Sequence, residues 1–340
     1  MKLLVLGGTR FLGRHLVDAA LARGDKVTLF TRGKQPNHWG SAVDLRNGNR
    51  DPAIAPGLSA IEEGSWDAVV DTSGYVPRVV RASAQLLAPR VGRYLFVSSI
   101  SVFTDASRPG LNERDPVGAL EDPGTEEIGK FYGPLKAACE RVVSEIYGYR
   151  ALNVRPGLIV GPHDPTDRFG YWVARFVHPA LLGARSAKAV VPDPPSRPLQ
   201  FIDARDLAAL MLELLDKGLE GTHNATSPAG QWTMQTLVDA LVQAGGANAP
   251  QPQWVDEALL TEHKVQPWTG LPLWIPSTFG DEAGFMQIDC TKAQRAGLRT
   301  RPLEQTIADS AQWLVQRDNA GAWKDVMTAD AEREILDAVR

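Results

Sequence analysis

The chain of 340 residues is 44% hydrophobic and 22% charged, an ordinary globular composition that allows one large domain or two lobes with sizeable cores. Its net charge of −4 argues against a nucleic-acid-binding surface, which would carry a basic excess. Two cysteines provide no disulfide framework and no apolar run approaches the roughly 18 residues of a membrane span, so we expect a cytoplasmic protein without a membrane partner.

The first 23 residues predict a buried strand, a glycine turn and a helix. Residues 2–6 form an apolar run without polar alternation, and the helical spacing of apolar residues begins at Leu12. Two glycines between these elements would let the backbone approach a pyrophosphate at the start of the helix. Arg10 departs from the usual glycine spacing, and an ordinary glycine turn is the alternative. The candidate cofactor-binding residues here are Gly7, Gly8, Thr9, Arg10, Phe11, Leu12 and Gly13.

A second apolar strand is expected over residues 26–30, and a basic turn follows it. In a dinucleotide-binding fold the end of this strand faces the adenosine ribose. A carboxylate there suits the 2′-hydroxyl of NAD, whereas a cation suits the 2′-phosphate of NADP. Arg32 and Lys34 stand at this point without a carboxylate, and we expect Arg10 nearby. The sequence therefore favours NADP(H), with NAD(H) and a merely solvated turn left open.

Further strands and helices alternate along the chain. Buried strands are expected over 67–71, 93–97 and 152–155, and helices over a stretch from Pro77 and over 132–147. Such alternation is typical of an α/β fold, a Rossmann-type doubly wound parallel sheet. Ligands of these sheets bind beyond the carboxyl ends of the strands. The break after residue 71, which contains Ser73, Gly74 and Tyr75, is such a position.

The pattern changes after Pro156. Residues 161–167 are turn-rich and 191–198 are rich in proline, and a return strand at 199–202 leads into a helix at 206–217. We expect an irregular lobe over 225–290 and closing helices near 303–317 and 329–338, the last either a packed arm or a frayed tail. The predicted organisation is a dinucleotide-binding domain of 1–160 plus 199–225, a smaller, irregular C-terminal substrate lobe of 161–198 plus 226–325, and a helical tail of 326–340.

Tyr132 and Lys136 are the sharpest chemical signal, because residues i and i+4 share one face of a helix. Pro134 is tolerable only in the first helical turn, so Tyr132 is expected at or just outside the helix start. An ammonium about 4 Å from the phenol oxygen would lower the tyrosine pKa. A tyrosine with a lowered pKa can exchange a proton with a substrate oxygen near neutral pH.

Serines follow the strand that ends at Val97. Ser98, Ser99 or Ser101 could donate a hydrogen bond to the same substrate oxygen, or merely satisfy backbone groups where the strand ends.

In this order, the glycine turn, the strand-end serine and Tyr-x-x-x-Lys resemble the extended form of the short-chain dehydrogenase/reductase superfamily. Residues 153–162 and 201–208 add to the resemblance, which covers roughly residues 1–225, and the glycine pattern looks like an atypical branch often labelled NAD(P)-dependent epimerase/dehydratase. The resemblance implies hydride transfer between nicotinamide and a substrate carbon. It makes Tyr132 the acid/base and Ser99 the donor to the substrate oxygen, while Lys136 holds the nicotinamide ribose. The cofactor site is then expected to include Ser73, Gly74, Val97, Tyr132, Lys136 and Pro156 as well.

The leading hypothesis is an NADP-dependent oxidoreductase, a carbonyl reductase or alcohol dehydrogenase acting on a small metabolite. Dehydratases of this family carry an Asp-Glu pair where this chain has Ile100 and Ser101, and many epimerases carry an arginine at the position of Leu199, which Arg197 could replace. An epimerase of a sugar or sugar-nucleotide with tightly bound cofactor is therefore the alternative. A non-enzymatic nucleotide- or RNA-binding relative is the third hypothesis.

The remaining expectations concern substrate and partners. The six histidines show no metal-ligand spacing, so no metal site is expected. A homodimer through helices near 78–90 and 130–147, as in relatives, is left open. Substrate contacts are assigned to Tyr75, Ser101, His163, Arg168 and Trp172, with a core role equally open for Trp172.

Overall fold

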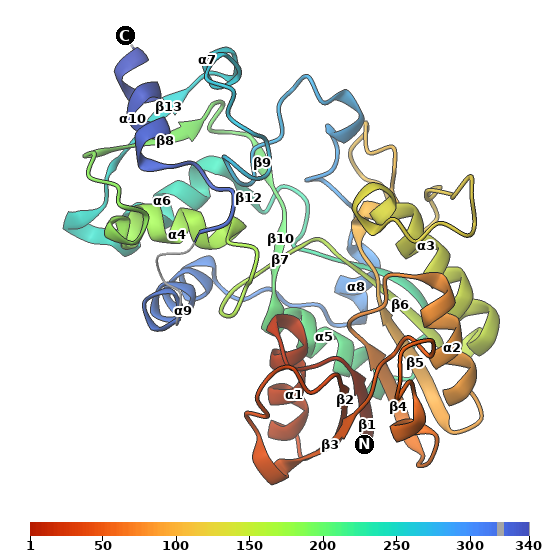
Figure 1. Cartoon of the computed structure of the whole chain (residues 1–340). Helices are drawn as coiled ribbons and strands as arrows, with labels where there is room; N and C mark the ends of the chain where they lie inside the picture. Colours follow the sequence, from red (N-terminus) through yellow and green to blue (C-terminus); the bar gives the residue numbers. More distant parts are fainter. Residues whose placement is uncertain (318–322, 340) are drawn as a thin grey trace.

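A seven-stranded parallel sheet forms the centre of the protein, in the strand order β11-β6-β5-β4-β1-β2-β3 (Figure 1). The computed structural model describes residues 1–317 and 323–339, apart from the side chain of Asp281. The α/β doubly wound fold predicted from the sequence is confirmed. The strands are β1 Lys2–Leu6, β2 Lys26–Thr31, β3 Val43–Asn47, β4 Trp66–Asp71, β5 Val91–Val97, β6 Ala151–Pro156 and β11 Gly221–Ala225.

Helices cover both faces of this sheet. On one face α1 (Phe11–Ala22) packs with α5 (Ala204–Asp216), and α8 (Thr291–Ala296) joins the same core. On the other face α2 (Pro77–Leu87) packs with α3 (Ile128–Tyr147). The central strands are buried between these layers, which is why their sequences read as continuous apolar runs.

The two outer strands lay outside the sequence-based expectation. Strand β3 has the sequence VDLRN and is largely exposed, and β11 has the polar sequence GTHNA. Neither carries the apolar run that marks the central strands, since each is covered by a neighbour on one edge only. The expected return strand is also divided: β9 (Pro198–Leu199) pairs with β12 (Trp232–Thr233), and β10 (Phe201–Asp203) pairs with β7 (Leu158–Val160).

A second lobe has its own hydrophobic core above the carboxyl ends of the strands (Figure 1). Its helices are α4 Arg168–Val177, α6 Met234–Gly245, α7 Glu257–Glu262, α9 Leu303–Gln316 and α10 Ala329–Ala338, and β8 Lys188–Pro192 pairs with β13 Gln251–Val255. The expectation that 225–290 is irregular is therefore wrong for α6, whose Leu237, Val238 and Leu241 form a buried helical face. The predicted domain boundaries remain a prediction.

The last helix is a packed arm rather than a frayed tail. Glu332 of α10 is buried and accepts a hydrogen bond from Arg175 Nε at 2.8 Å and from the backbone amide of Val190 at 3.1 Å. Ile335, one turn further along, is fully buried in the core of the lobe. Within residues 1–317 and 323–339, no helix combines the length and the apolar character needed to span a membrane.

Candidate active site

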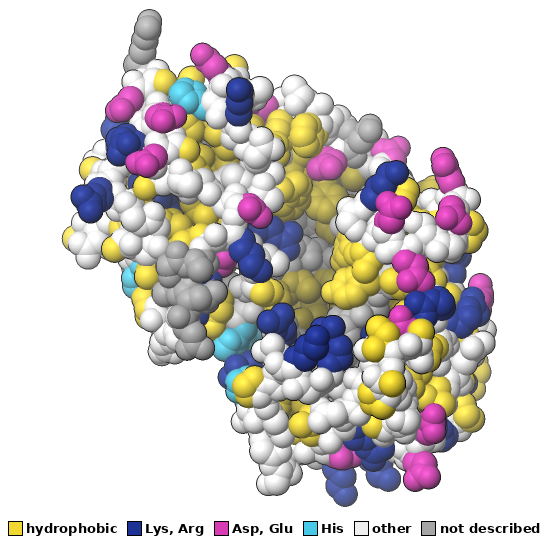
Figure 2. All heavy atoms as spheres, in the orientation of Figure 1, with side chains coloured by type: hydrophobic (Ala, Val, Ile, Leu, Met, Phe, Trp, Pro, Cys, Tyr) yellow, Lys and Arg dark blue, Asp and Glu magenta, His cyan; other side chains and the backbone are white. Residues whose placement is uncertain are grey.

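A cavity of about 1150 Å³ opens at the carboxyl ends of the strands, where the face in Figure 2 is hollowed between the two lobes. This volume exceeds the range of most single-ligand pockets, so it has room for a dinucleotide and a substrate together. Most of the residues singled out in the sequence line it: Gly7, Gly8, Thr9, Arg10, Phe11, Leu12, Gly13, Arg32, Ser73, Tyr75, Val97, Ser99, Ser101, Tyr132, Lys136, Pro156 and Arg168.

At the glycine turn between β1 and α1, no side chain of Gly7 or Gly8 covers the backbone that lines one end of this cavity. Gly7 has φ +104°, and a Cβ there would stand 2.6 Å from Thr72 Oγ1. Gly8 has φ +95°, and a Cβ on Gly13 would stand 2.5 Å from the Gly8 Cα. Arg10 is the N-cap residue of α1, so its side chain is accommodated where the usual spacing has glycine. The turn therefore fits the pyrophosphate of a dinucleotide at the helix N-terminus.

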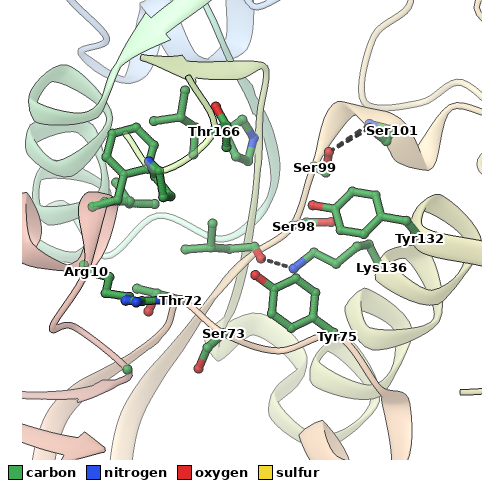
Figure 3. A pocket seen from close by; sticks show the side chains of 18 of the residues that line it. Arg10, Thr72, Ser73, Tyr75, Ser98, Ser99, Ser101, Tyr132, Lys136 and Thr166 are labelled. Carbon is green, nitrogen blue, oxygen red and sulfur yellow. Dashed lines mark hydrogen bonds between the residues drawn. The ribbon is translucent and has the colours of Figure 1, made fainter. Parts of the chain in front are cut away.

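The basic residues at the cofactor end do not all reach the cavity. Arg10 and Arg32 line it, whereas Lys34 is exposed and lies outside the lining. The prediction that Lys34 contacts the cofactor is therefore not supported by its position. In Figure 3 the Arg10 side chain lies across the cavity from Tyr132 and Ser99.

A local break in α3 positions Tyr132. Phe131 has non-helical angles (φ −119°, ψ 31°), so the regular helix that contains Pro134 begins at Tyr132, although the element as a whole starts at Ile128. A Cβ on Gly133 would stand 1.9 Å from the Ser101 backbone oxygen, so the helix packs directly on the turn after β5.

That turn presents the serines beside Tyr132. Ser99 Oγ accepts a hydrogen bond from the Ser101 amide and donates to Ser101 Oγ, both at 3.1 Å. Ser98 Oγ is buried without a hydrogen-bond partner among the described residues. Figure 3 shows Ser98, Ser99 and Tyr132 on the same side of the cavity, with Lys136 below them.

Lys136 is buried and its ammonium is bound to backbone. Nζ donates to the carbonyl oxygens of Gly74 at 2.8 Å and Val97 at 2.6 Å, and it lies 4.9 Å from the centre of the Tyr75 ring. Gly74 itself lies outside the cavity lining and accepts this hydrogen bond through its backbone carbonyl. Burial lowers the pKa of Lys136 to about 8.

The expected lowering of the Tyr132 pKa by Lys136 is wrong for this state of the protein. Burial raises the pKa of Tyr132, and the nearby Ser99 hydroxyl and Arg168 cation only oppose that rise. The reason is the direction of the Lys136 ammonium, which binds two carbonyls instead of the phenol. Tyr132 is therefore held in its protonated form, ready to donate a proton rather than to accept one.

Two expected substrate contacts lie elsewhere. Trp172 is fully buried, and its indole N–H donates to the Pro272 carbonyl at 2.9 Å, so it belongs to the core of the second lobe. His163 packs between His15 and Trp313, with ring centroids 5.7 Å from each, and it lies outside the cavity lining. Burial lowers the pKa of His163 to about 4.

Sequence reasoning missed Arg50, which also lines the cavity. Its guanidinium binds both oxygens of the fully buried Asp71, with Nη2 to Oδ2 at 2.6 Å, and also reaches Ser73 Oγ at 3.2 Å. Tyr94 donates a hydrogen bond to the same carboxylate at 2.9 Å. The one signal in the sequence was Asp71 at the end of a buried strand, because such a carboxylate requires a cation.

Comparison with known proteins agrees with this geometry. A model of the NAD dependent epimerase/dehydratase family matches residues 3–226. A chloroplast stem-loop binding protein of 41 kDa from Arabidopsis thaliana is 25% identical over 74% of this chain and 65% of its own length. A 2-alkyl-3-oxoalkanoate reductase from Stenotrophomonas maltophilia is 30% identical over 48% of this chain and 52% of its own length. The chain thus spans less than two thirds of these two relatives.

A solved structure shows the same fold over nearly the whole chain. The UDP-glucuronic acid 4-epimerase from Bacillus cereus, a complex with NAD, superposes with a TM-score of 0.64 at 15% identity, covering 93% of this chain and 99% of that one.

Proposed function

Because the chain belongs to the NAD-dependent epimerase/dehydratase family and is therefore an enzyme, we propose that it is an NADP-dependent oxidoreductase that reduces the carbonyl, or oxidises the alcohol, of a small metabolite. The observation that carries this proposal is the meeting of Ser99, Tyr132 and Lys136 in one cavity with the glycine turn. A nicotinamide cofactor is the shared chemistry of the family; the preference for NADP(H) is part of the proposal.

The proposed mechanism uses two of these side chains on the substrate oxygen. Ser99, whose hydroxyl would exchange its hydrogen bond to Ser101 Oγ for one to the substrate, holds the carbonyl oxygen. Tyr132, whose burial keeps it protonated, transfers its phenolic proton to that oxygen. A nicotinamide cofactor held by the glycine turn and Lys136 would supply the hydride chemistry in either direction. Lys136, now bound to two backbone carbonyls, would hold the ribose hydroxyls and keep a positive charge beneath the reacting groups.

The charge pattern at the other end of the cavity supports NADP(H). Arg10 and Arg32 both line the cavity, and a guanidinium can bind a 2′-phosphate through two hydrogen bonds. Neither arginine has an ion pair with another described residue. NAD(H) remains the alternative cofactor.

The burial of Leu199 and the hydrogen bonds of Arg197 disfavour a sugar-nucleotide substrate. Leu199, at the position of the diphosphate-binding arginine of many epimerases, is fully buried. Arg197, which could have replaced it, donates to the carbonyls of Ile275 at 2.6 Å and Asp193 at 2.7 Å and pairs with Glu257. The relative named as a 2-alkyl-3-oxoalkanoate reductase, in contrast, supports reduction of a carbonyl.

The proposal is tested by titrating the protein with NADPH and NADH while following cofactor fluorescence, and then by a panel of carbonyl compounds with the preferred cofactor. We expect tighter binding of NADPH and stoichiometric NADPH oxidation with at least one small ketone or aldehyde. Conversion of UDP-glucose to an epimer without net NADPH consumption would instead identify the epimerase.

The remaining assignments stay proposals. A small molecule is the proposed partner, and nucleic-acid binding is not proposed, because the net charge is −4. The cytoplasmic location is proposed from the two cysteines, Cys139 and Cys290, which are both free and buried. A homodimer through the α2 and α3 faces is kept as an open prediction.

A further inference from the structure

An arginine in the substrate half of the cavity has an unpaired end. Arg168, the first residue of α4, lines the cavity and is half-buried. Its Nε donates to Thr166 Oγ1 at 3.1 Å. Among residues 1–317 and 323–339, neither of its Nη atoms has a hydrogen-bond partner, and neither is sealed inside the protein. The outer edge of the guanidinium therefore faces open cavity.

The neighbours of Arg168 hold the guanidinium in place. The Thr166 hydroxyl that accepts from Nε donates in turn to Asp164 Oδ1 at 2.7 Å, so it is fixed on both sides. The Arg168 Cζ also lies 5.9 Å from the centre of the Trp268 ring. In Figure 3 Thr166 lies across the cavity from Ser99, Ser101 and Tyr132. A guanidinium ordered in this way loses little entropy when it binds a ligand.

Arg168 has no direct anionic partner within the site, because Asp164, the carboxylate that favours its charge, is linked to it only through the Thr166 hydroxyl. No described carboxylate forms an ion pair with it, and the buried Asp164 Oδ2 has no hydrogen-bond partner. Burial raises the pKa of Asp164 and lowers the pKa of Arg168, so each group is under pressure to lose its charge. Removing a cation from water without an anionic partner is unfavourable. An anionic group of a ligand would supply that partner.

We propose that Arg168 binds a carboxylate of the substrate, which makes the substrate an apolar oxo acid. The inference rests on the proposed function, because it takes the cavity to be the site of carbonyl reduction. The apolar part of such a molecule has a matching wall, formed by Ile100, Phe103, Ala106 and Phe285. A single carboxylate fits better than a diphosphate, because Arg10 lies at the glycine turn, Arg32 follows β2 at the cofactor end, and Arg50 is bound to Asp71.

The catalytic test compares acids with their neutral esters. The probes are 2-, 4- and 6-oxooctanoate and the methyl ester of each, assayed with NADPH. For the best acid we expect kcat/KM to exceed that of its ester by about 10-fold or more, the worth of one hydrogen bond to a charged group. Arg168→Leu should abolish that ratio, so that the acid and its ester are reduced with similar kcat/KM. Arg168→Lys should retain part of the ratio, because lysine keeps the positive charge but cannot form the bidentate hydrogen bonds of a guanidinium.

A binding experiment tests this inference separately from the proposed function. Octanoate and methyl octanoate are titrated into the NADPH complex of the wild-type protein, of Arg168→Leu and of Arg185→Leu, the last replacing an exposed arginine of the same lobe. We expect octanoate to bind about 10-fold more tightly than its ester to the wild type and Arg185→Leu, and no more tightly to Arg168→Leu. If octanoate binds with this preference but no ketone is reduced, the proposed reductase function is refuted and the inferred carboxylate site still stands. An acid preference that survives in Arg168→Leu, or no acid preference in the wild type, would overturn the inference.

Discussion

Replacing Tyr132 by phenylalanine should lower kcat for ketone reduction by about 10²- to 10⁴-fold, the usual contribution of a positioned general acid. The change removes only the phenolic oxygen, so the packing of the ring and the affinity for NADPH should stay as they are. Steady-state kinetics with the ketone found active in the carbonyl panel, together with an NADPH titration, measure both. The matched control is Tyr75→Phe: Tyr75 lines the same cavity, with its ring centroid 6.3 Å from that of Tyr132. A large loss of kcat in Tyr75→Phe and none in Tyr132→Phe would show that Tyr132 is not the general acid.

The pH dependence of the same reaction follows from the two perturbed groups. Reduction needs protonated Tyr132, and burial raises the pKa of Tyr132, so this group should leave kcat/KM constant through neutral pH and lower it only at strongly alkaline pH. Alcohol oxidation needs the phenolate and should rise over the same alkaline range. A separate fall in kcat/KM as the pH rises through about 8 would report the loss of the Lys136 charge, because burial lowers the pKa of Lys136 to about 8. Lys136→Arg should remove that fall, because arginine stays charged.

Replacing both Arg10 and Arg32 by alanine should raise the Kd for NADPH by about 100-fold, because each guanidinium contributes a charge-assisted hydrogen bond to the 2′-phosphate. The Kd for NADH should change little, since that cofactor has no such phosphate. The control is Lys34→Ala, which replaces an exposed cation of the same turn that lies outside the cavity lining. Fluorescence titration of the wild type and both variants gives the Kd for each cofactor. An equal loss for both cofactors would mean that the arginines do not recognise the phosphate.

The sequence predicted well the strands whose apolar runs correspond to burial on both faces of the sheet. Strands β1, β4 and β5 are buried on both faces, and their apolar runs follow from that burial. Strands β3 and β11 were missed because an edge strand with exposed or polar residues has no such run. The alternation of strands and helices and the family resemblance together were sufficient to predict a site at the carboxyl ends of the strands.

The site was predictable in its residues but not in its contacts. Tyr132 and Lys136 share a helix face as their spacing predicts, yet the ammonium binds the carbonyls of Gly74 and Val97, which come from distant segments of the chain. Arg50 was missed for a similar reason, since its partner Asp71 is 21 residues away. For Trp172 the sequence left a substrate contact and a core role equally open, because the residues that bury it come from segments such as that of Pro272.

The central claim is that the phenol of Tyr132, the hydroxyl of Ser99 and the ammonium of Lys136 surround the reacting end of one bound nicotinamide. The most direct measurement is a crystal structure of the protein with NADP⁺. We predict the pyrophosphate at the glycine turn, the ribose against Lys136, and the nicotinamide ring facing Tyr132 and Ser99. A cofactor bound outside this cavity, or a nicotinamide turned away from Tyr132, would contradict the account.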